Sequence, residues 1–293
     1  MKHVKISLLA ALSLLAAACT AHDDQVYQPT AVTIHTNGFT ISQEDFPNTK
    51  SDPVSPGSTS VVNAVTLAFY DSEGNEQYKS TQLKSDPSNY TTFGTFNLTL
   101  PMGAYTMVAI AHTTKEESPF ELTSLTSASY TGAHAFETFS CTQAVNIENT
   151  NPVELSATLS RVVSMLSVIS SDTKTANAAR VRMTLSAGGK SFNPTTGLAS
   201  VNTGFSNTVG ISAAVGASST SSTCLFLATD EQTMNVTIEV LDDNENVLYS
   251  KTVQNVPFKR NRKTKLTGKV YSSSAETSFL LSSDWLTAEE ASF

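Results

Sequence analysis

The sequence has few of the residues from which catalytic and metal sites are built. Among its 293 residues are three cysteines, five histidines and one tryptophan, and only 15% of the residues are charged. No histidine stands at metal-ligand spacing from another histidine, a cysteine or a carboxylate cluster. There is no Gly-x-Ser-x-Gly nucleophile turn and no glycine-rich phosphate loop. We therefore predict no catalytic residue, no cofactor and no bound metal.

Two weaker chemical signals need an interpretation. The acidic segments 71–76 and 242–246 lack the ligand spacing of a calcium loop, so we interpret them as solvated hairpin turns. The carboxylate pair of a glycosidase meets only in the folded chain, so spacing alone leaves that enzyme class open. Sugar clefts usually contain aromatic platforms, however, and the single tryptophan, Trp285, lies in a segment typical of a last, packed strand.

The only long apolar run lies near the start of the chain and is too short to cross a membrane. It covers residues 6–18, whereas a spanning helix needs about 20 apolar residues. Two lysines precede it and Cys19 follows, an order typical of a lipoprotein signal peptide (residues 1–18). Ala16 replaces the usual large aliphatic residue, so an ordinary signal peptide with a chance cysteine is the alternative. We predict that Cys19 is acylated, with palmitate-type chains, and that residues 19–30 form a tether to the outer membrane.

Positive charge is also scarce. The formal net charge is −8 and the calculated isoelectric point is about 5.1. This balance argues against nucleic acid or an anionic membrane surface as a partner. Asp23 and Asp24, soon after the cysteine, resemble the acidic export signal of surface lipoproteins in Bacteroidetes. We therefore expect an outer-membrane lipoprotein that is exposed at the surface.

The alternation of apolar and polar residues is typical of β-strands. In residues 63–80, NAVTLAFYDSEGNEQYKS, every second residue is apolar before an acidic turn, and a second strand follows. Residues 235–252, NVTIEVLDDNENVLYSKT, follow the same plan. The predicted fold class is all-β, with two tandem β-sandwich domains of similar design over residues 31–158 and 159–293.

Three local segments are less regular. Residues 159–170 fit one face of a helix, but their β-branched content favours a strand. Over Ser118–Ser127, a serine that could cap and a proline in the first turn predict a short connecting helix. Cys141 and Cys224 lie in strand-like segments, and although an envelope location permits a disulfide, we predict two unpaired core thiols.

The densest positive charge is the run KRNRKTKLTGK at residues 259–269. It lacks the stacking aromatics of a nucleic-acid patch, so we interpret it as charge that blunts an exposed strand edge. Residues 256–268 also match the pattern Val-Pro-x-x-Arg-Asn-x-x-Thr-x-x-x-Gly. Together with the lipoprotein start, the segment LSRVVSMLSV at 159–168 and the late Trp285, this run resembles the fimbrillin superfamily of Bacteroidales, the subunits of type V pili.

The resemblance implies two transthyretin-like β-sandwich domains, no enzymatic activity, and assembly with other pilus subunits by donor-strand exchange. In stalk subunits of that family a protease cuts after a basic residue in an early loop, and the first strand leaves. Here the first strand is expected over residues 31–41, with a bulge or tight hairpin at Asn37–Gly38. Lys50 is the basic residue of the loop that follows, and no arginine precedes Arg161. A subunit cut at Lys50 and an uncut, lipid-bearing anchor both remain open.

The sequence therefore predicts a structural subunit of a fimbrium that serves cell adhesion, either on the surface or within the fibre. The alternative is a surface lipoprotein of β-sandwich type that binds a glycan. A glycosidase is the third hypothesis and has the least support. The sequence does not identify a host ligand or the partner subunits.

Overall fold

The computed structural model describes residues 29–39, 60–272 and 280–283, and these form β-strands with connecting turns. The first half contains β1 (Thr30–Phe39), β2 (Ala64–Tyr70), β3 (Glu76–Leu83), β4 (Thr95–Leu100), β5 (Gly103–His112), β6 (Phe120–Ser124), β7 (Ser127–Tyr130), β8 (Thr138–Ile147) and β9 (Val153–Arg161). The second half contains β10 (Ser164–Ser170), β11 (Arg180–Leu185), β12 (Ser191–Asn193), β13 (Leu198–Ala199), β14 (Phe205–Gly210), β15 (Thr220–Leu225), β16 (Glu231–Leu241), β17 (Val247–Lys259), β18 (Lys263–Gly268) and β19 (Leu280–Ser283). The predicted all-β fold class is confirmed.

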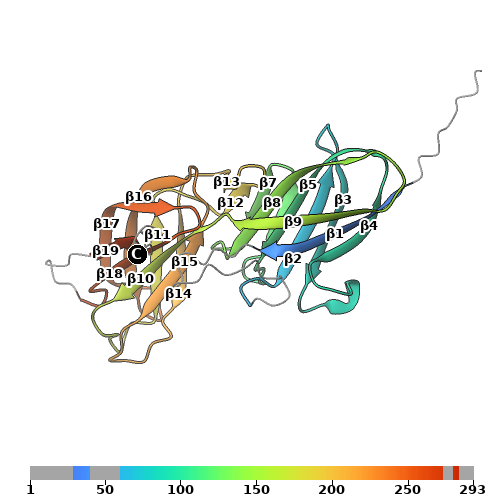
Figure 1. Cartoon of the computed structure of the whole chain (residues 1–293). Helices are drawn as coiled ribbons and strands as arrows, with labels where there is room; N and C mark the ends of the chain where they lie inside the picture. The colour runs from blue at the N-terminus through green and yellow to red at the C-terminus, as the bar shows by residue number, and fades with distance from the viewer. Residues whose placement is uncertain (1–28, 40–59, 273–279, 284–293) are drawn as a thin grey trace, which may run out of the picture.

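The first half is one sheet that divides into two layers. Its strand order is β3-β2-β5-β8-β9-β1-β4. β8 and β9 pair at only two positions, so the layer β3-β2-β5-β8 separates there from the layer β9-β1-β4 (Figure 1). Leu67 and Phe69 of β2 and Phe96 of β4 lie in one buried cluster between the layers. Burial of such side chains is what holds a β-sandwich together.

The second half repeats this plan along the chain. Its layers are β14-β11-β16-β17 and β15-β10-β18, with β19 added at the outer side of β18. If β6, β7, β12, β13 and β19 are left out and the remaining strands are numbered from the start of each half, the two halves have the same strand order. They also share the same orientations: β1 runs parallel to β9, as β10 does to β18, and the other pairs within the layers are antiparallel.

The four remaining short strands join the two halves. Hairpin β6–β7 of the first half and hairpin β12–β13 of the second form one sheet of order β13-β12-β7-β6. Phe192 of β12 lies opposite Ala128 of β7. Beneath this sheet lies a buried cluster that contains Ala68 and Ile110 from the first half and Phe226 from the second. The halves therefore share a hydrophobic core and do not merely follow one another.

This shared sheet explains why β2 departs from the expected alternation. All seven residues of β2 are buried, because one face meets the sandwich core and the other, with Ala68 and Tyr70, meets the shared cluster. A strand covered on both faces has no solvent side on which polar residues would be required. The alternation of Thr66 with apolar residues therefore does not mean that Thr66 faces solvent, and Thr66 is only 4% exposed.

The predicted short helix over Ser118–Ser127 is wrong. The segment forms β6 and the start of β7, and the described residues contain a single 3-10 turn, Pro87–Asn89, and no α-helix. The Ser118 hydroxyl donates to the carbonyl of His134 instead of capping a helix. Tertiary packing overrides the local signal, because Leu122 is buried in the shared cluster as part of a strand that pairs with β7.

The two acidic hairpins are real, but they are not equivalent parts of the repeat. β2–β3 corresponds by strand order to β11 and β14, whereas the second acidic turn joins β16 to β17. Their likeness is one of turn chemistry. Asp71 accepts hydrogen bonds from the backbone N–H groups of Glu73 and Asn75, and Asp242 does the same two and four residues onward. The hydrogen bonds from Asn75 and Asn246 lower the pKa of the carboxyl groups of Asp71 and Asp242, respectively.

Candidate functional site

The first candidate site is the position of the first strand. β1 lies inside the sheet, parallel to β9 on one side and antiparallel to β4 on the other (Figure 1). Ile34, for example, lies opposite Leu155 of β9 and Phe96 of β4. We call the space that β1 fills between β9 and β4 the β1 slot.

Apolar burial and backbone pairing both hold β1 in its slot. Val32 and Ile34 are 1% and 0% exposed and belong to the core cluster of the first half. Full burial of two such side chains is worth about 3–6 kcal/mol. Thr30 is also buried, and its hydroxyl donates to the carbonyl of Asn149 at 2.9 Å. On the other face the Thr33 hydroxyl donates to Oδ1 of Asn97 at 3.1 Å.

The strand register changes near the end of β1. The pairing with β9 shifts between His35 and Gly38, so the irregularity expected at Asn37–Gly38 is confirmed. Lys50 lies in the segment 40–59, which joins β1 to the remainder of the chain and is outside the described residues, as is Cys19. Acylation of Cys19 and cleavage at Lys50 stay predictions.

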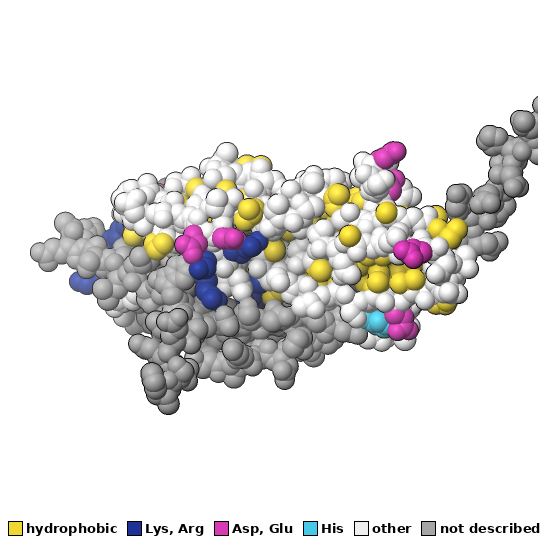
Figure 2. All heavy atoms as spheres, turned by 45° about the horizontal axis from the view of Figure 1, so that its top comes forward, with side chains coloured by type: hydrophobic (Ala, Val, Ile, Leu, Met, Phe, Trp, Pro, Cys, Tyr) yellow, Lys and Arg dark blue, Asp and Glu magenta, His cyan; other side chains and the backbone are white. Residues whose placement is uncertain are grey.

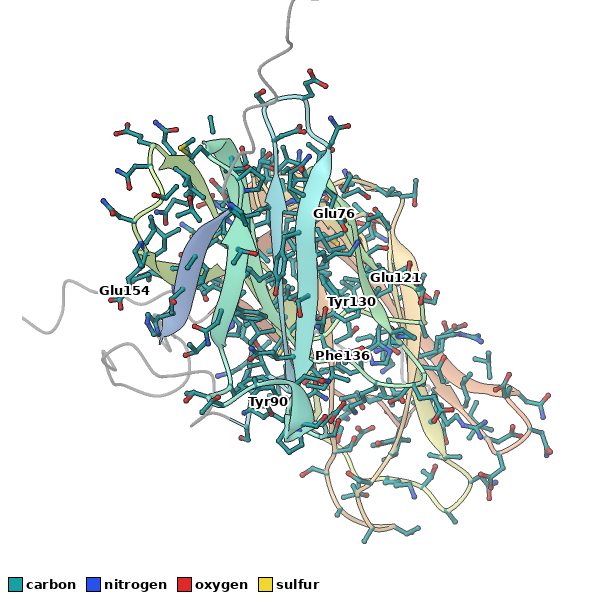
Figure 3. The ribbon with its side chains drawn as sticks, turned by 90° about the vertical axis from the view of Figure 1, so that its right-hand side faces the viewer. Glu76, Tyr90, Glu121, Tyr130, Phe136 and Glu154 are labelled. Carbon is teal, nitrogen blue, oxygen red and sulfur yellow. The ribbon has the colours of Figure 1, made fainter. Side chains whose placement is uncertain are left out.

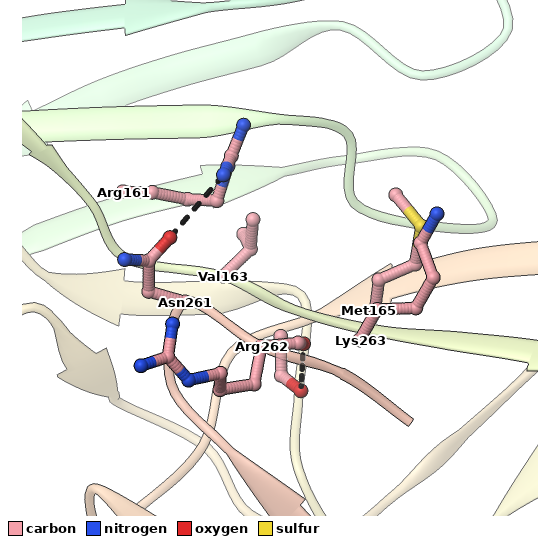
Figure 4. Close-up of a pocket in the computed structure, with 7 residues that line it drawn as sticks. Arg161, Val163, Met165, Asn261, Arg262 and Lys263 are labelled. Atoms are coloured by element: carbon pink, nitrogen blue, oxygen red, sulfur yellow. Dashed lines mark hydrogen bonds between the residues drawn. The ribbon is translucent and has the colours of Figure 1, made fainter. Parts of the chain in front are cut away.

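A second cluster of functional interest lies where the halves meet. Arg161, the last residue of β9, donates from Nε to Glu137 at 2.7 Å and from Nη1 to Oδ1 of Asn261 at 3.2 Å. Its guanidinium also lies 4.8 Å from the centre of the Phe139 ring, and its side chain is only 9% exposed. Figure 4 shows Arg161 and Asn261 facing one another across this junction. The small hollow drawn there, about 20 Å³, has room for little more than a water molecule.

The basic run that resembles the fimbrillin pattern forms part of this junction. It connects β17 of one layer to β18 of the other, with Asn261 in the left-handed region at φ 59°. Arg260 donates to the carbonyl of Thr196 at 2.9 Å and pairs with Asp230 at 2.7 Å. The edge-blunting interpretation is wrong for β18, because this strand lies between β10 and β19. Its basic residues alternate with the buried Thr264 and Leu266, so they face outward from an internal strand.

Arg161 and Asn261 were not predicted to be partners. They are 100 residues apart in the chain, and the only local signal is an asparagine within the basic run, a residue type that tolerates the left-handed conformation. A hollow of about 370 Å³ beside them is lined by Arg161, Arg260 and hydroxyl side chains. Both guanidinium groups already have carboxylate partners, which reduces their capacity to hold an anion.

The titratable side chains in the interior have structural roles. His112 is 1% exposed, and burial lowers its pKa to about 3, so the ring is neutral at physiological pH. The ring packs on Phe120 at 4.0 Å, and Nε2 lies 3.0 Å from the Thr66 hydroxyl. Cys141 and Cys224 are unpaired, as predicted, and burial raises the pKa of both thiols.

Within the described ranges, no group of three histidine, cysteine or acidic side chains is placed to hold a metal ion. In the same ranges, no helix is sufficiently long and apolar to span a bilayer. On the face shown in Figure 2, basic side chains lie beside acidic ones without a broad patch of one sign.

Comparison with known proteins places the whole described body in one family. A family model described as a family of unknown function (DUF6562) matches residues 30–287. No curated protein sequence matches the chain.

Solved structures share the fold at low sequence identity. A protein from Bacteroides ovatus, described as a candidate adhesin, has a TM-score of 0.53 and 11% identity, covering 88% of this chain and 94% of that chain. A second adhesin candidate from Bacteroides ovatus ATCC 8483 has a TM-score of 0.51 and 11% identity, with coverages of 84% and 88%. The fimbrial anchor protein Mfa2 from Porphyromonas gingivalis has a TM-score of 0.51 and 11% identity, with coverages of 87% and 95%.

Proposed function

Because the chain belongs to the DUF6562 family, whose function is unknown, we propose its function from its fold: it is a structural subunit of a surface fimbrium. The observation that carries this proposal is the β1 slot. The likeness in fold to a fimbrial anchor protein and to two candidate adhesins supports the same reading. The conclusion is a structural and adhesive role with no enzymatic activity.

The position of β1 makes it suited to exchange. It is the first strand of the body, so a single cut in the segment 40–59 severs its only covalent connection to the other strands. When β1 leaves, the backbone groups of β4 and β9 that paired with it lose their partners. The space that Val32 and Ile34 filled becomes an open apolar groove. An extended strand from another subunit can form the missing backbone hydrogen bonds and fill the apolar groove with its own side chains. This is the physical basis of donor-strand complementation.

The lipid anchor and the cleavage site belong to the same scheme. Cys19 carries acyl chains that hold the exported protein at the outer membrane, and Lys50 is the site at which a trypsin-like protease releases β1. Residues 31–158 and 159–293 act as tandem sandwich domains of transthyretin-like type. The strands change from one half to the other between Arg161 and Ser164. Loss of a palmitate label from a Cys19→Ser variant, and its release from the membrane fraction, test the lipid anchor.

Limited trypsin treatment of the purified chain tests strand exchange. We expect cleavage after Lys50, loss of residues up to that point, and slow formation of ladders on mildly denaturing gels. Sequencing of the new N-terminus locates the cut, and size-exclusion chromatography follows assembly. The cause of assembly is the opened slot, whose apolar surface and backbone groups favour pairing with a second chain.

The matched control is Lys50→Gln, which keeps the length and polarity of the loop but removes the cleavage site. It should stay monomeric under the same treatment. A chain that is cut after Lys50, has lost β1 and still remains a monomer would contradict strand exchange. A chain that resists cutting at Lys50 in the folded state argues for the uncut anchor.

A further inference from the structure

A second surface feature lies on the open side of the first sandwich, away from the junction. β3 and β4 are the two end strands of the seven-stranded order, and a hollow of about 360 Å³ lies between them. Its lining comes from β3, from β4 and from the connection between these strands, and it includes Tyr78, Ser80, Asn89, Tyr90, Thr91 and Asn97. Figure 3 shows Tyr90 beyond the end of β3 that is opposite Glu76. The volume of the hollow falls within the range of small-ligand sites.

The lining has a distinctive chemistry, because none of its side chains carries a charge. It offers the rings of Tyr78 and Tyr90 together with carboxamides and hydroxyls, whereas Phe96 is only 3% exposed and packs in the core. Such a site has nothing with which to hold a phosphate, a sulfate or a metal ion strongly. Aromatic faces with neighbouring amides and hydroxyls instead match an uncharged saccharide, which presents apolar C–H faces and many hydroxyl groups.

The walls of the hollow are held in place before any ligand arrives. The Gln82 side chain donates to the carbonyl of Thr95 at 2.7 Å and accepts from the N–H of Gly94 at 2.7 Å, which ties β3 to the start of β4. The Tyr90 hydroxyl donates to the carbonyl of Leu83 at 3.0 Å, and its ring packs edgewise on Phe93. Such preorganisation reduces the entropy lost on binding.

Several polar groups of the lining retain hydrogen-bonding capacity. Within the described residues, the hydroxyls of Tyr78, Ser80 and Thr91 make no hydrogen bond. The side-chain nitrogen of Asn89 donates to Asp86, so its oxygen remains available as an acceptor. The side-chain oxygen of Asn97 accepts from Thr33, so its nitrogen remains available as a donor. The hollow therefore offers donors and acceptors close to aromatic surface.

We propose that the hollow between β3 and β4 binds an uncharged saccharide, with Tyr78 and Tyr90 supplying the aromatic contacts and Asn89, Asn97 and Ser80 the hydrogen bonds. The site is an addition to the role as a fimbrial subunit and does not depend on subunit assembly. The β4 wall is held by β1, since Thr33 and His35 pair with Asn97 and Thr95. Binding therefore requires a strand in the β1 slot, which the uncut chain provides.

The test uses the uncut chain and an array of neutral oligosaccharides built from hexoses and N-acetylhexosamines, with sialylated and sulfated versions of the same glycans. We expect a subset of the neutral glycans to bind. Titration calorimetry with the best neutral glycan should show binding at least tenfold weaker for Ser80→Trp, whose ring fills the hollow. Thr91→Trp obstructs the rim from an exposed loop position and should weaken binding without a risk to folding.

Thr81→Trp is the matched control, because Thr81 is the next residue of β3, is exposed and points to the opposite face. It should bind as the unmodified chain does. The proposal is overturned if no neutral glycan binds, if only the sialylated or sulfated glycans bind, or if both Ser80→Trp and Thr91→Trp bind as tightly as Thr81→Trp. Since the assay uses the uncut monomer, its failure leaves the strand-exchange result unaffected, and the reverse also holds.

Discussion

A chain that begins at residue 60, and so lacks β1, is expected to lose its folded monomeric state. It forfeits the burial of Val32 and Ile34, about 3–6 kcal/mol, and leaves the facing backbone groups of β4 and β9 unpaired. Whole proteins of this kind are stable by only about 5–15 kcal/mol, so the loss is a large fraction of the total. Size-exclusion chromatography should show aggregates or oligomers, and the thermal unfolding midpoint should fall sharply.

The same truncated chain provides the control. A synthetic peptide of residues 28–41, added during refolding, should refill the β1 slot and restore the monomer. A peptide with Ile34→Asp should not, because it would place an unpaired carboxylate in the apolar core, at a cost of several kcal/mol. A truncated chain that is monomeric and melts like the full chain would show that β1 is dispensable, and the slot would then explain nothing about assembly.

The second large effect is expected from Phe192→Ala, in the core that the two halves share. Phe192 is fully buried, and its ring stacks on that of Phe226 with centres 4.5 Å apart and planes 18° apart. Removal of such a ring from a packed core typically costs about 3–5 kcal/mol. Chemical denaturation should therefore show a lower free energy of unfolding, and the single transition should separate into two as the halves uncouple.

Val201→Ala is the control for this change, because Val201 lies close by in the sequence and is 50% exposed. Its free energy of unfolding should stay within about 0.5 kcal/mol of the unmodified chain. A cost below about 1 kcal/mol for Phe192→Ala, with one unchanged transition, would contradict a shared core. It would mean that β12 contributes little to the coupling of the halves.

The shared core bears on the proposed role in a fibre. A subunit under tension transmits force from one end to the other, and here β9 continues almost directly into β10 through Val162 and Val163, both buried. The pairing of β7 with β12 and the hydrogen bond from Arg161 to Asn261 form additional connections between the halves. The two sandwiches are thus linked by the chain and also by packing.

Local sequence determined much of what is seen. Alternating apolar residues predicted strands such as β2 and β16, and the run 159–170 became the end of β9 and β10, with a break at Val162–Val163. The acidic turns formed as expected, because an aspartate that accepts from backbone groups two and four residues ahead needs no other part of the fold. The irregularity near Asn37–Gly38 has a similar local origin.

Only the tertiary structure decided which strands became neighbours. No pattern within residues 30–39 reveals that this strand lies between β9 and β4, since an apolar face fits any groove of suitable width. The segment 118–127 became part of a hairpin because a second hairpin, some 60 residues later, completed its sheet. The basic run lies on an internal strand because β19 pairs with the outer side of β18. Periodicity and turn chemistry act over a few residues, whereas strand pairing joins residues far apart in the chain. The sequence by itself therefore determined the strands and turns, and the packing of distant strands decided where the slot, the junction and the uncharged hollow lie.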